Sequence, residues 1–432
     1  MKTNLEGQEF EGEVLRLAFG GKGVMRCDGL VVFVPFVAPG ETVKAKISRQ
    51  HKNFAEANVL QIIDPSPQRR QPLCPYFGRC GGCQLQHMAY EQQVAQKAHF
   101  VEDALSRIGK LKLPEPVSIV PSKIEWAYRR HIRLTLFTEG ETYCVGYVGI
   151  DDVALIAVQQ CPIFALDGIV QAVGELVGKL AYVGNIRGHL SVIKDGADQY
   201  VLYFDLPDAV PANLDQLLQE AIQSSGPIVG AMWKAGDRGE TFGKTDCHFA
   251  ISDLNIAYSP MVFVQSHPEQ SEHIYHQIEA LTQSCGAKSV LDLYCGIGVT
   301  SLLLEKQGAT VVGIESNPQA IVLAKQNARN NDCKNVTFEC ADVAKVIRQI
   351  VKQKFDLVIL NPPRIGSDAH TLEAIASAKP AHIVYVSCMP ATLARDLSML
   401  CGFGYNIEAV RAYDMFPQTT HVETVVLLRY VR

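Results

Sequence analysis

The sequence predicts an α/β protein whose C-terminal part is a doubly wound domain, preceded by a small β-barrel and a central β-rich region. From about Cys285 onward, short apolar runs alternate with helical segments, which is typical of a parallel sheet covered by helices. In the first 63 residues, short strand-like runs are separated by glycine-rich turns, which favours a small barrel. We therefore expect three domains, over residues 1–63, 64–250 and 251–432.

Composition is that of an ordinary globular protein: 432 residues, 47% hydrophobic and 20% charged. No apolar run is long enough to cross a bilayer, and residues 1–10 lack a signal-peptide core, so we expect a cytoplasmic protein. Nothing in the sequence indicates an obligate protein partner, and we expect a monomer. Although the net charge is −5, residues 1–133 carry 19 Lys and Arg against 13 Asp and Glu. This basic front part suits contact with phosphates.

The elements of the first two domains follow from their hydrophobic periodicity. The runs expected to build the barrel are 13–17, 30–36, 42–47 and 57–63. A proline-rich linker over residues 64–72 follows the barrel. Residues 90–108 carry apolar side chains at helical spacing, and this helix can pack on the C-terminal domain. The central domain is expected to be rich in strands, including 134–137, 143–148, 190–194 and 200–204.

The first strand of the C-terminal sheet, 290–293, leads into a glycine-containing turn over residues 294–298. Glycines there allow the backbone to turn sharply and to approach a ligand closely. Glu315 ends the next strand, where a carboxylate can accept hydrogen bonds from both ribose hydroxyls, and Asp342 follows the third strand, within reach of an adenine edge. Ser301 stands where a dinucleotide fingerprint has its third glycine, so the pattern favours an adenosyl ligand. A structural turn with surface acids is the alternative.

The ends of the fourth and fifth strands are expected on the ligand side of the sheet. The fourth strand ends in Asn361-Pro362-Pro363-Arg364, and Arg364 stands where enzymes that methylate exocyclic amines commonly have a stacking aromatic ring, so it disfavours that chemistry. Cys388 follows the fifth strand close to a helix start, where a thiol's pKa is lowered and the thiolate can act as a nucleophile. Without this context, a buried structural cysteine would be the commoner interpretation.

A thiol and a general base in one pocket suit methylation of carbon 5 of uracil. Thiolate addition to carbon 6 gives an enolate whose carbon 5 can accept a methyl group, and a base must then remove the carbon-5 proton so that the thiolate can leave. Glu423 is an isolated acid at the start of an apolar final run, where burial raises its pKa into a useful range. His421 is the competing base candidate, and a salt-bridge role is the alternative for Glu423.

Three C-terminal motifs resemble the RNA uracil-5-methyltransferase family: Cys388-Met389-Pro390-Ala391-Thr392, Asp414-Met415-Phe416-Pro417 and His421-Val422-Glu423-Thr424. With the barrel and a cysteine cluster, the chain resembles over nearly its whole length the bacterial 23S ribosomal RNA members that carry a TRAM domain and an iron–sulfur cluster. The resemblance implies a Rossmann-like catalytic domain that uses S-adenosylmethionine, with Cys388 as the nucleophile and Glu423 as the base. It also implies an OB-like TRAM barrel that binds RNA.

The resemblance further implies a set of contacts with S-adenosylmethionine. With the turn glycine, the implied cofactor-binding residues are Gln265, Tyr294, Gly296, Glu315, Asp342 and Asn361. Three positions depart from the common family pattern. Asn361 replaces an Asp found in many members, so it keeps an acceptor but loses the charge, while Met389 and His267 stand where Asn is common.

Three closely spaced cysteines, Cys74, Cys80 and Cys83, have the spacing C-x5-C-x2-C, which indicates a metal site. Cys161, followed by proline, is the best candidate for a fourth thiolate. Four cysteines would also suit zinc, but three clustered cysteines and a distant Cys-Pro fit a 4Fe–4S cluster better. The family resemblance favours the iron–sulfur cluster, with a role in folding or RNA positioning rather than in redox catalysis.

RNA contacts are expected on the barrel and at residues 126–133, where aromatic and basic side chains interleave as in segments that stack on unpaired bases. A charged surface strand is the alternative for 126–133. The basic side chains of the barrel that could meet phosphates are Lys22, Arg26, Lys44, Lys46, Arg49 and Lys52. We expect 23S ribosomal RNA as the substrate. A related enzyme acting on transfer RNA and a catalytically silent RNA-binding protein are the rival interpretations.

Overall fold

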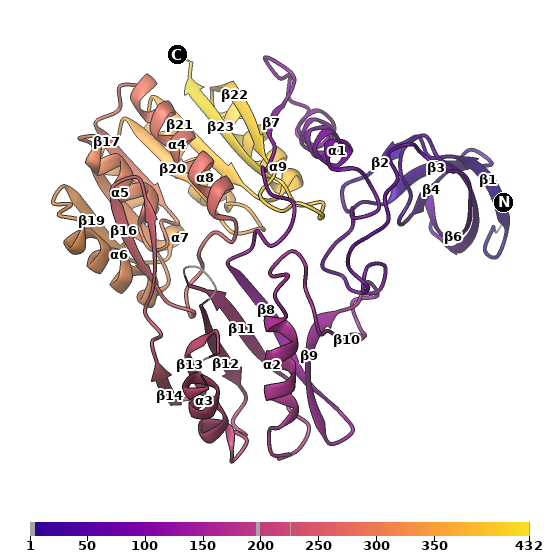
Figure 1. Ribbon diagram of the computed structural model, residues 1–432. Coiled ribbons are helices and arrows are strands. Elements are labelled where there is room, and N and C mark those ends of the chain that lie inside the picture. Colours follow the sequence, from indigo (N-terminus) through magenta and orange to yellow (C-terminus); the bar gives the residue numbers. More distant parts are fainter. Residues whose placement is uncertain (1–4, 196–198, 225, 432) are drawn as a thin grey trace.

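A computed structural model describes residues 5–195, 199–224 and 226–431 of the chain. The barrel, the central sheet region and the C-terminal α/β layer lie around a common junction, with the barrel at one side (Figure 1). In the described part of the chain, none of the helices has the length and apolar character that a bilayer crossing requires.

The N-terminal body is a six-stranded sheet of strand order β1-β5-β6-β4-β3-β2, which curls around its own apolar core (Figure 1). Its strands are β1 (Glu9–Glu13), β2 (Arg16–Leu17), β3 (Gly23–Cys27), β4 (Leu30–Val34), β5 (Thr42–Gln50) and β6 (Phe54–Asp64). The predicted run 13–17 is wrong as one strand, because the chain leaves the sheet between β1 and β2. Strand β3 was not predicted.

The central body is a seven-stranded, mainly antiparallel sheet of order β10-β9-β8-β11-β12-β13-β14, with α2 and α3 packed against it. The predicted central strands all lie within observed ones. The elements are β8 (His131–Glu139), β9 (Thr142–Val148), β10 (Leu155–Ala157), α2 (Ile169–Gly178), β11 (Gly188–Lys194), β12 (Tyr200–Leu206), α3 (Leu214–Gln223), β13 (Ile228–Ala235) and β14 (Arg238–Gly243). A hairpin of β15 (Cys247–Ile251) and β16 (Leu254–Tyr258) follows.

The C-terminal sheet has eight strands in the order β19-β18-β17-β20-β21-β23-β22-β7. Strands β17 to β21 are parallel, whereas β23 runs antiparallel between β21 and β22. The elements are α4 (Pro268–Ser284), β17 (Ser289–Leu293), α5 (Val299–Lys306), β18 (Thr310–Glu315), α6 (Pro318–Asn330), β19 (Val336–Cys340), α7 (Val343–Ile350), a 3-10 turn (Val351–Gln353), β20 (Leu357–Leu360), α8 (Ala369–Ala378), β21 (His382–Ser387), α9 (Pro390–Gly402), β22 (Tyr405–Tyr413) and β23 (Glu423–Tyr430).

Helices cover both faces of this sheet, as expected for a doubly wound domain. One apolar cluster joins the sheet to α7, α8 and α9, and another joins the opposite face to α4 and α5. The carboxyl ends of β17, β20 and β21 therefore meet at one edge, where the chain turns into loops that are free to bind a ligand.

The helix expected over residues 90–108 is α1 (Tyr90–Asp103), continued by a π-helical turn (Ala104–Ile108). Val101 and Leu105 belong to the same apolar cluster as α8 and α9. Downstream of α1, strand β7 (Ser118–Val120) pairs in parallel with β22 and completes the edge of the C-terminal sheet. This early part of the chain is therefore built into the C-terminal layer.

Candidate active site and cysteine cluster

The sheet register brings Cys388 and Glu423 together. Strands β21 and β23 are antiparallel neighbours, and Ser387, the last residue of β21, faces Thr424. Cys388 comes directly after Ser387, and Glu423 directly before Thr424. The two side chains thus leave adjacent strands at the ligand edge of the sheet, although they are far apart in sequence. Cys388 is half-buried, whereas Glu423 is 5% exposed. Among the residues that the structure describes, none forms a hydrogen bond with the Glu423 carboxylate oxygen Oε2.

Arg364 supplies the positive charge beside this pair. Its backbone carbonyl accepts a hydrogen bond of 3.1 Å from the Thr392 hydroxyl, which ties the loop after β20 to α9. Its guanidinium Nη2 lies 3.4 Å from Nε2 of His421. The sequence analysis used Arg364 only to exclude a stacking aromatic residue and missed this contact. The Pro-Pro-Arg motif places Arg364 directly after the fourth predicted strand, but it does not show where the side chain of Arg364 points.

Burial sets the proton affinities of the pair. Burial raises the pKa of Glu423 from 4.5 to about 8, and the nearby Arg364 cation opposes that shift. Burial and the negative charge of Glu423 raise the pKa of the Cys388 thiol to about 11, contrary to the lowering expected from the nearby helix start, while Arg364 favours the thiolate. Burial and the Arg364 cation lower the pKa of His421 to about 4, so its imidazole is neutral at pH 7. A neutral, weakly basic His421 is a poorer proton acceptor than an ionised Glu423.

A cavity beside the pair is lined by several of the residues expected to bind S-adenosylmethionine. Gln265, Tyr294, Gly296 and Asn361 all line it, and so does Val386 from the end of β21. Oε1 of Gln265 is buried without a hydrogen-bond partner in the described structure. An orphaned buried acceptor at a cavity wall is the mark of a missing ligand, because leaving it unpaired costs free energy.

The two predicted acidic positions differ in placement. Glu315 accepts hydrogen bonds from the backbone N–H groups of Gly296 (3.2 Å) and Asn317 (2.8 Å), so it lies at the glycine turn next to this cavity. Asp342 is exposed, begins α7 and accepts a hydrogen bond from the Ala344 N–H at 3.1 Å. Asp342 does not line the cavity in the described structure.

The structure explains two departures from the family pattern. His267 is fully buried, stacks on Tyr128 with ring centroids 4.8 Å apart, and has Nε2 2.8 Å from the Ser122 hydroxyl. It therefore has a structural role at this position. Met389 occupies the N-cap position of α9 without a side-chain cap, and its N–H instead donates to the Ser387 hydroxyl at 3.1 Å.

The four predicted cluster cysteines, Cys74, Cys80, Cys83 and Cys161, line one cavity. Within the described ranges, no three His, Cys, Asp or Glu side chains converge as closely as the ligands of a single metal ion. The sulfur of Cys80 accepts from the Gly82 N–H at 3.4 Å, and that of Cys161 from the Tyr147 hydroxyl at 3.5 Å. Burial raises the pKa of Cys80 to about 11 and of Cys83 to about 12, so bound metal would displace protons here.

The same cavity extends toward the Cys388 and Glu423 pair, because Arg364, Phe416 and His421 also line it. Phe263 lines both this cavity and the one near Gln265, and its side chain is 75% exposed. The sequence analysis missed Phe263. Its place two residues before Gln265 was the available signal, but the exposure of its ring is seen only in the structure.

RNA contact by residues 126–133 stays a prediction: Trp126 is half-buried and Arg133 is exposed, but the middle of the segment faces inward. Tyr128 is 2% exposed and donates its hydroxyl proton to the carbonyl of Pro417 at 2.9 Å. The guanidinium of Arg129 lies 5.3 Å from the ring centroid of Phe416, so this segment packs inward against the C-terminal domain. On the barrel, Lys22 and Lys44 form ion pairs with acidic residues, of 2.6 Å and 2.9 Å.

Comparison with known proteins identifies the class. The family described as tRNA (Uracil-5-)-methyltransferase matches residues 246–431, and the TRAM domain matches residues 4–60. The chain is 42% identical to an uncharacterized RNA methyltransferase of Protochlamydia amoebophila over 98% of both chains. It is 33% identical to the 23S rRNA (uracil(1939)-C(5))-methyltransferase RlmD of Shewanella amazonensis, covering 98% of this chain and 96% of the relative.

A solved structure shares the whole architecture. The tRNA (uracil-54, C5)-methyltransferase of Pyrococcus abyssi, in complex with S-adenosyl-L-homocysteine, superposes with a TM-score of 0.76 at 25% identity, covering 97% of this chain and 99% of that one. The fold and the site thus define an S-adenosylmethionine-dependent methyltransferase with a TRAM domain. More narrowly, the chain belongs to the RNA (uracil-5-)-methyltransferase family.

Proposed function

We propose that this enzyme methylates carbon 5 of a uridine in 23S ribosomal RNA through a covalent bond between Cys388 and carbon 6 of the base. The observation that carries the proposal is the meeting of Cys388 and Glu423 at the ends of β21 and β23, with Arg364 beside them. This edge borders the cavity of the predicted cofactor residues. A nucleophile, a base and a methyl source are the three components that the reaction needs.

Cys388 begins the reaction. Its half-buried thiol loses a proton to solvent, and the thiolate, favoured by the Arg364 cation, forms a bond with carbon 6. The ring electrons move to carbon 5 and the adjacent carbonyl oxygen. S-adenosylmethionine, when bound, supplies the methyl group, whose bond to sulfur breaks as its bond to carbon 5 forms.

Glu423 ends the reaction. Its carboxylate removes the proton from carbon 5, the double bond between carbons 5 and 6 returns, and the bond from carbon 6 to Cys388 breaks. The group must be ionised to accept the proton, and Arg364 favours the ionised form. Since the carboxylate oxygen Oε2 has no hydrogen-bond partner in the described structure, it is free to face the base.

S-adenosylmethionine fits the cavity next to this pair. Gln265 presents an unpaired acceptor, Tyr294 and Gly296 form the turn after β17, and Asn361 lies at the end of β20. Glu315 would hold the ribose hydroxyls from its place beside that turn. We propose that Asp342 accepts a hydrogen bond from the adenine edge. It would do so at the rim of the cavity, since in the described structure it is not among the residues that line the cavity. Phe263 offers an exposed ring on which a flipped base can stack.

The cysteine cavity fits a 4Fe–4S cluster held by Cys74, Cys80, Cys83 and Cys161. The ligands of a cubane cluster bind four different iron atoms, so their sulfurs lie further apart than the ligands of one zinc ion. The support for the cluster is the cavity that the four cysteines share and their spacing in the sequence. Methyl transfer needs no electron, so the cluster would have a structural role. It would cross-link the segment before α1 to the central sheet.

The choice of ribosomal over transfer RNA rests on the relative from Shewanella amazonensis, which is 33% identical and is named for 23S rRNA. The Pyrococcus abyssi structure, at 25% identity, favours transfer RNA as the second candidate. The TRAM match supports an RNA-binding role for the barrel under either choice.

The decisive test separates substrate and mechanism. Purified wild type, Cys388→Ala and Glu423→Gln are incubated with labelled S-adenosylmethionine and separated ribosomal or transfer RNA from cells lacking the enzyme. We expect label in 23S rRNA with wild type only. A covalent protein–RNA band on a denaturing gel should form with Glu423→Gln and be absent with Cys388→Ala. Label in transfer RNA alone would overturn the substrate, and a band with Cys388→Ala would overturn the mechanism.

A further inference from the structure

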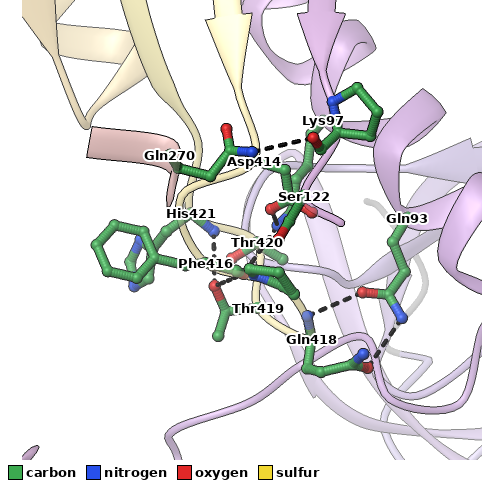
Figure 2. Close-up of polar contacts among 12 residues, drawn as sticks. Gln93, Lys97, Ser122, Gln270, Asp414, Phe416, Gln418, Thr419, Thr420 and His421 are labelled. Atoms are coloured by element: carbon green, nitrogen blue, oxygen red, sulfur yellow. Dashed lines mark hydrogen bonds and ion pairs between the residues drawn. The ribbon is translucent and has the colours of Figure 1, made fainter. Parts of the chain in front are cut away.

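Residues 414–421 make up nearly all of the loop between β22 and β23, and only Val422 separates them from the proposed base, Glu423. This loop is tightly buried: Asp414, Gln418 and Thr419 are at most 1% exposed. Its polar partners come from distant segments in the first third of the chain, including α1 (Figure 2). A loop that connects two strands usually faces solvent and has few such partners, so the burial and the many hydrogen bonds of residues 414–421 indicate a specific role for this loop.

Gln418 is the most constrained residue of the loop. Its φ of 71° is left-handed, a conformation that a residue with a Cβ adopts at a cost and keeps only when its surroundings impose it. Its carbonyl accepts hydrogen bonds from the backbone N–H groups of Gln84 (3.1 Å) and Leu85 (3.0 Å). Its side-chain amide donates to Glu125 at 3.3 Å.

Gln93 of α1 forms hydrogen bonds with both the backbone and the side chain of Gln418. Its Oε1 accepts from the Gln418 backbone N–H at 2.9 Å, and its Nε2 donates to Oε1 of Gln418 at 2.9 Å (Figure 2). The same Nε2 also donates to the Met88 carbonyl at 3.0 Å. Gln93 is 1% exposed, so every one of these bonds is made without competition from bulk water.

One further ion pair and three further hydrogen bonds hold the same loop. Lys97 of α1 forms a fully buried ion pair with Asp414 and donates to the Phe416 carbonyl at 2.9 Å. The Tyr128 hydroxyl donates to the carbonyl of Pro417, and the Thr420 N–H donates to the Gln84 side chain at 3.3 Å. The loop is therefore bound to helix α1 through Lys97, to Gln84 just after the cysteine cluster, and to Tyr128.

We propose that Gln93 is a positioning residue, which holds Gln418 in its left-handed conformation and thereby aims Glu423 at the target base. The proposal rests on the proposed function. Gln93 does not touch the reacting atoms and acts through the loop. Cys388 lies on a different segment, between β21 and α9, so loosening the loop impairs removal of the carbon-5 proton more than it impairs thiol addition.

The test compares Gln93→Leu with Gln92→Leu. Gln92 is the neighbouring glutamine of α1, and in the described structure its side chain makes no hydrogen bond with residues 414–421. Each variant is mixed with RNA and S-adenosylmethionine, and the covalent protein–RNA band and the released methylated RNA are followed over time. We expect Gln93→Leu to form the band at a rate near wild type and to release product about tenfold to a hundredfold more slowly, as expected for a misplaced catalytic group. The band should therefore accumulate.

Two results would overturn the proposal: behaviour identical to Gln92→Leu, or equal slowing of band formation and release, which is the signature of a merely structural role. If Gln93→Leu does not fold, Gln418→Ala carries the test. Alanine keeps the strain of the left-handed conformation and loses the side-chain bond to Gln93, so product release should slow and the band should accumulate. Gln418→Gly is the matched control, because glycine adopts that conformation without strain and should release product near the wild-type rate. Failure of the proposed function would look different, because Glu423→Gln would then form no covalent protein–RNA band.

Discussion

The burial of Glu423 predicts a specific loss of stability as the pH rises. The carboxyl has a folded-state pKa of about 8 against an ordinary value of 4.5. Below pH 4.5 the group is protonated in both states and its contribution to stability is complete. As the pH rises, the unfolded chain ionises first, so stability falls until the folded pKa of about 8 is passed.

The size of the effect follows from the shift. Each unit of pKa difference corresponds to about 1.4 kcal/mol, so the span from about pH 5 to about pH 8 removes about 4 kcal/mol from the free energy of unfolding. Glu423→Gln has nearly the same shape but does not titrate. The difference in free energy of unfolding between this variant and wild type should therefore grow by that amount over the same range.

The assay is urea unfolding of both proteins, followed by circular dichroism, at several pH values between 5 and 8.5. Because both proteins carry the same other titratable groups, their difference isolates Glu423. A difference that stays constant across the range would refute the reasoning, since the carboxyl would then titrate alike in the folded and unfolded chain. Activity should show the opposite trend, with product release rising toward pH 8 as the base ionises.

Three other perturbations have defined outcomes. Lys97→Met leaves the fully buried Asp414 carboxylate unpaired and should lower the free energy of unfolding by about 3–5 kcal/mol in denaturant titrations, with much of the loss recovered when Asp414→Leu is added. Gly21→Ala should reduce thermal stability and turnover more than Gly20→Ala, although both residues have positive φ. At Gly21 the added methyl group would lie 3.0 Å from the Gln84 side chain and 3.1 Å from that of Thr420 in loop 414–421, whereas at Gly20 it would meet no atom of the described residues within 4 Å. Glu315→Ala should weaken S-adenosylmethionine binding about tenfold or more in calorimetry, because a charged hydrogen-bond acceptor at the ribose is lost; unchanged affinity would remove Glu315 from the site.

Much of the C-terminal fold could be predicted because its strands are short, continuous apolar runs. Sheet strands such as β20 and β21 are buried on both faces, and their residues leave little ambiguity. The position of Cys388 at the end of β21 followed from the same pattern. What the pattern could not give is the antiparallel insertion of β23 beside β21, and that pairing is what brings Glu423 to the thiol.

Buried polar side chains account for most of what the sequence analysis missed. Gln93 and Lys97 lie on α1 between its apolar positions, where polar residues normally face solvent, yet both are buried. Their partners Gln418 and Asp414 lie more than 300 residues further along the chain, beyond the reach of local periodicity. Tyr128 and Arg129 of the segment 126–133 were expected to face RNA for the same reason, although both find partners in the C-terminal domain.

The most direct measurement is the identity of the protein atom that bonds to the RNA. RNA in which the substrate uridines are replaced by 5-fluorouridine cannot lose a proton from carbon 5, so the adduct cannot be resolved by Glu423. After incubation with S-adenosylmethionine, nuclease and protease digestion, mass spectrometry should find a methylated fluorouridine nucleotide on the peptide that contains Cys388. A modified peptide that lacks Cys388, or an active enzyme that leaves every peptide unmodified, would contradict covalent catalysis by this thiol.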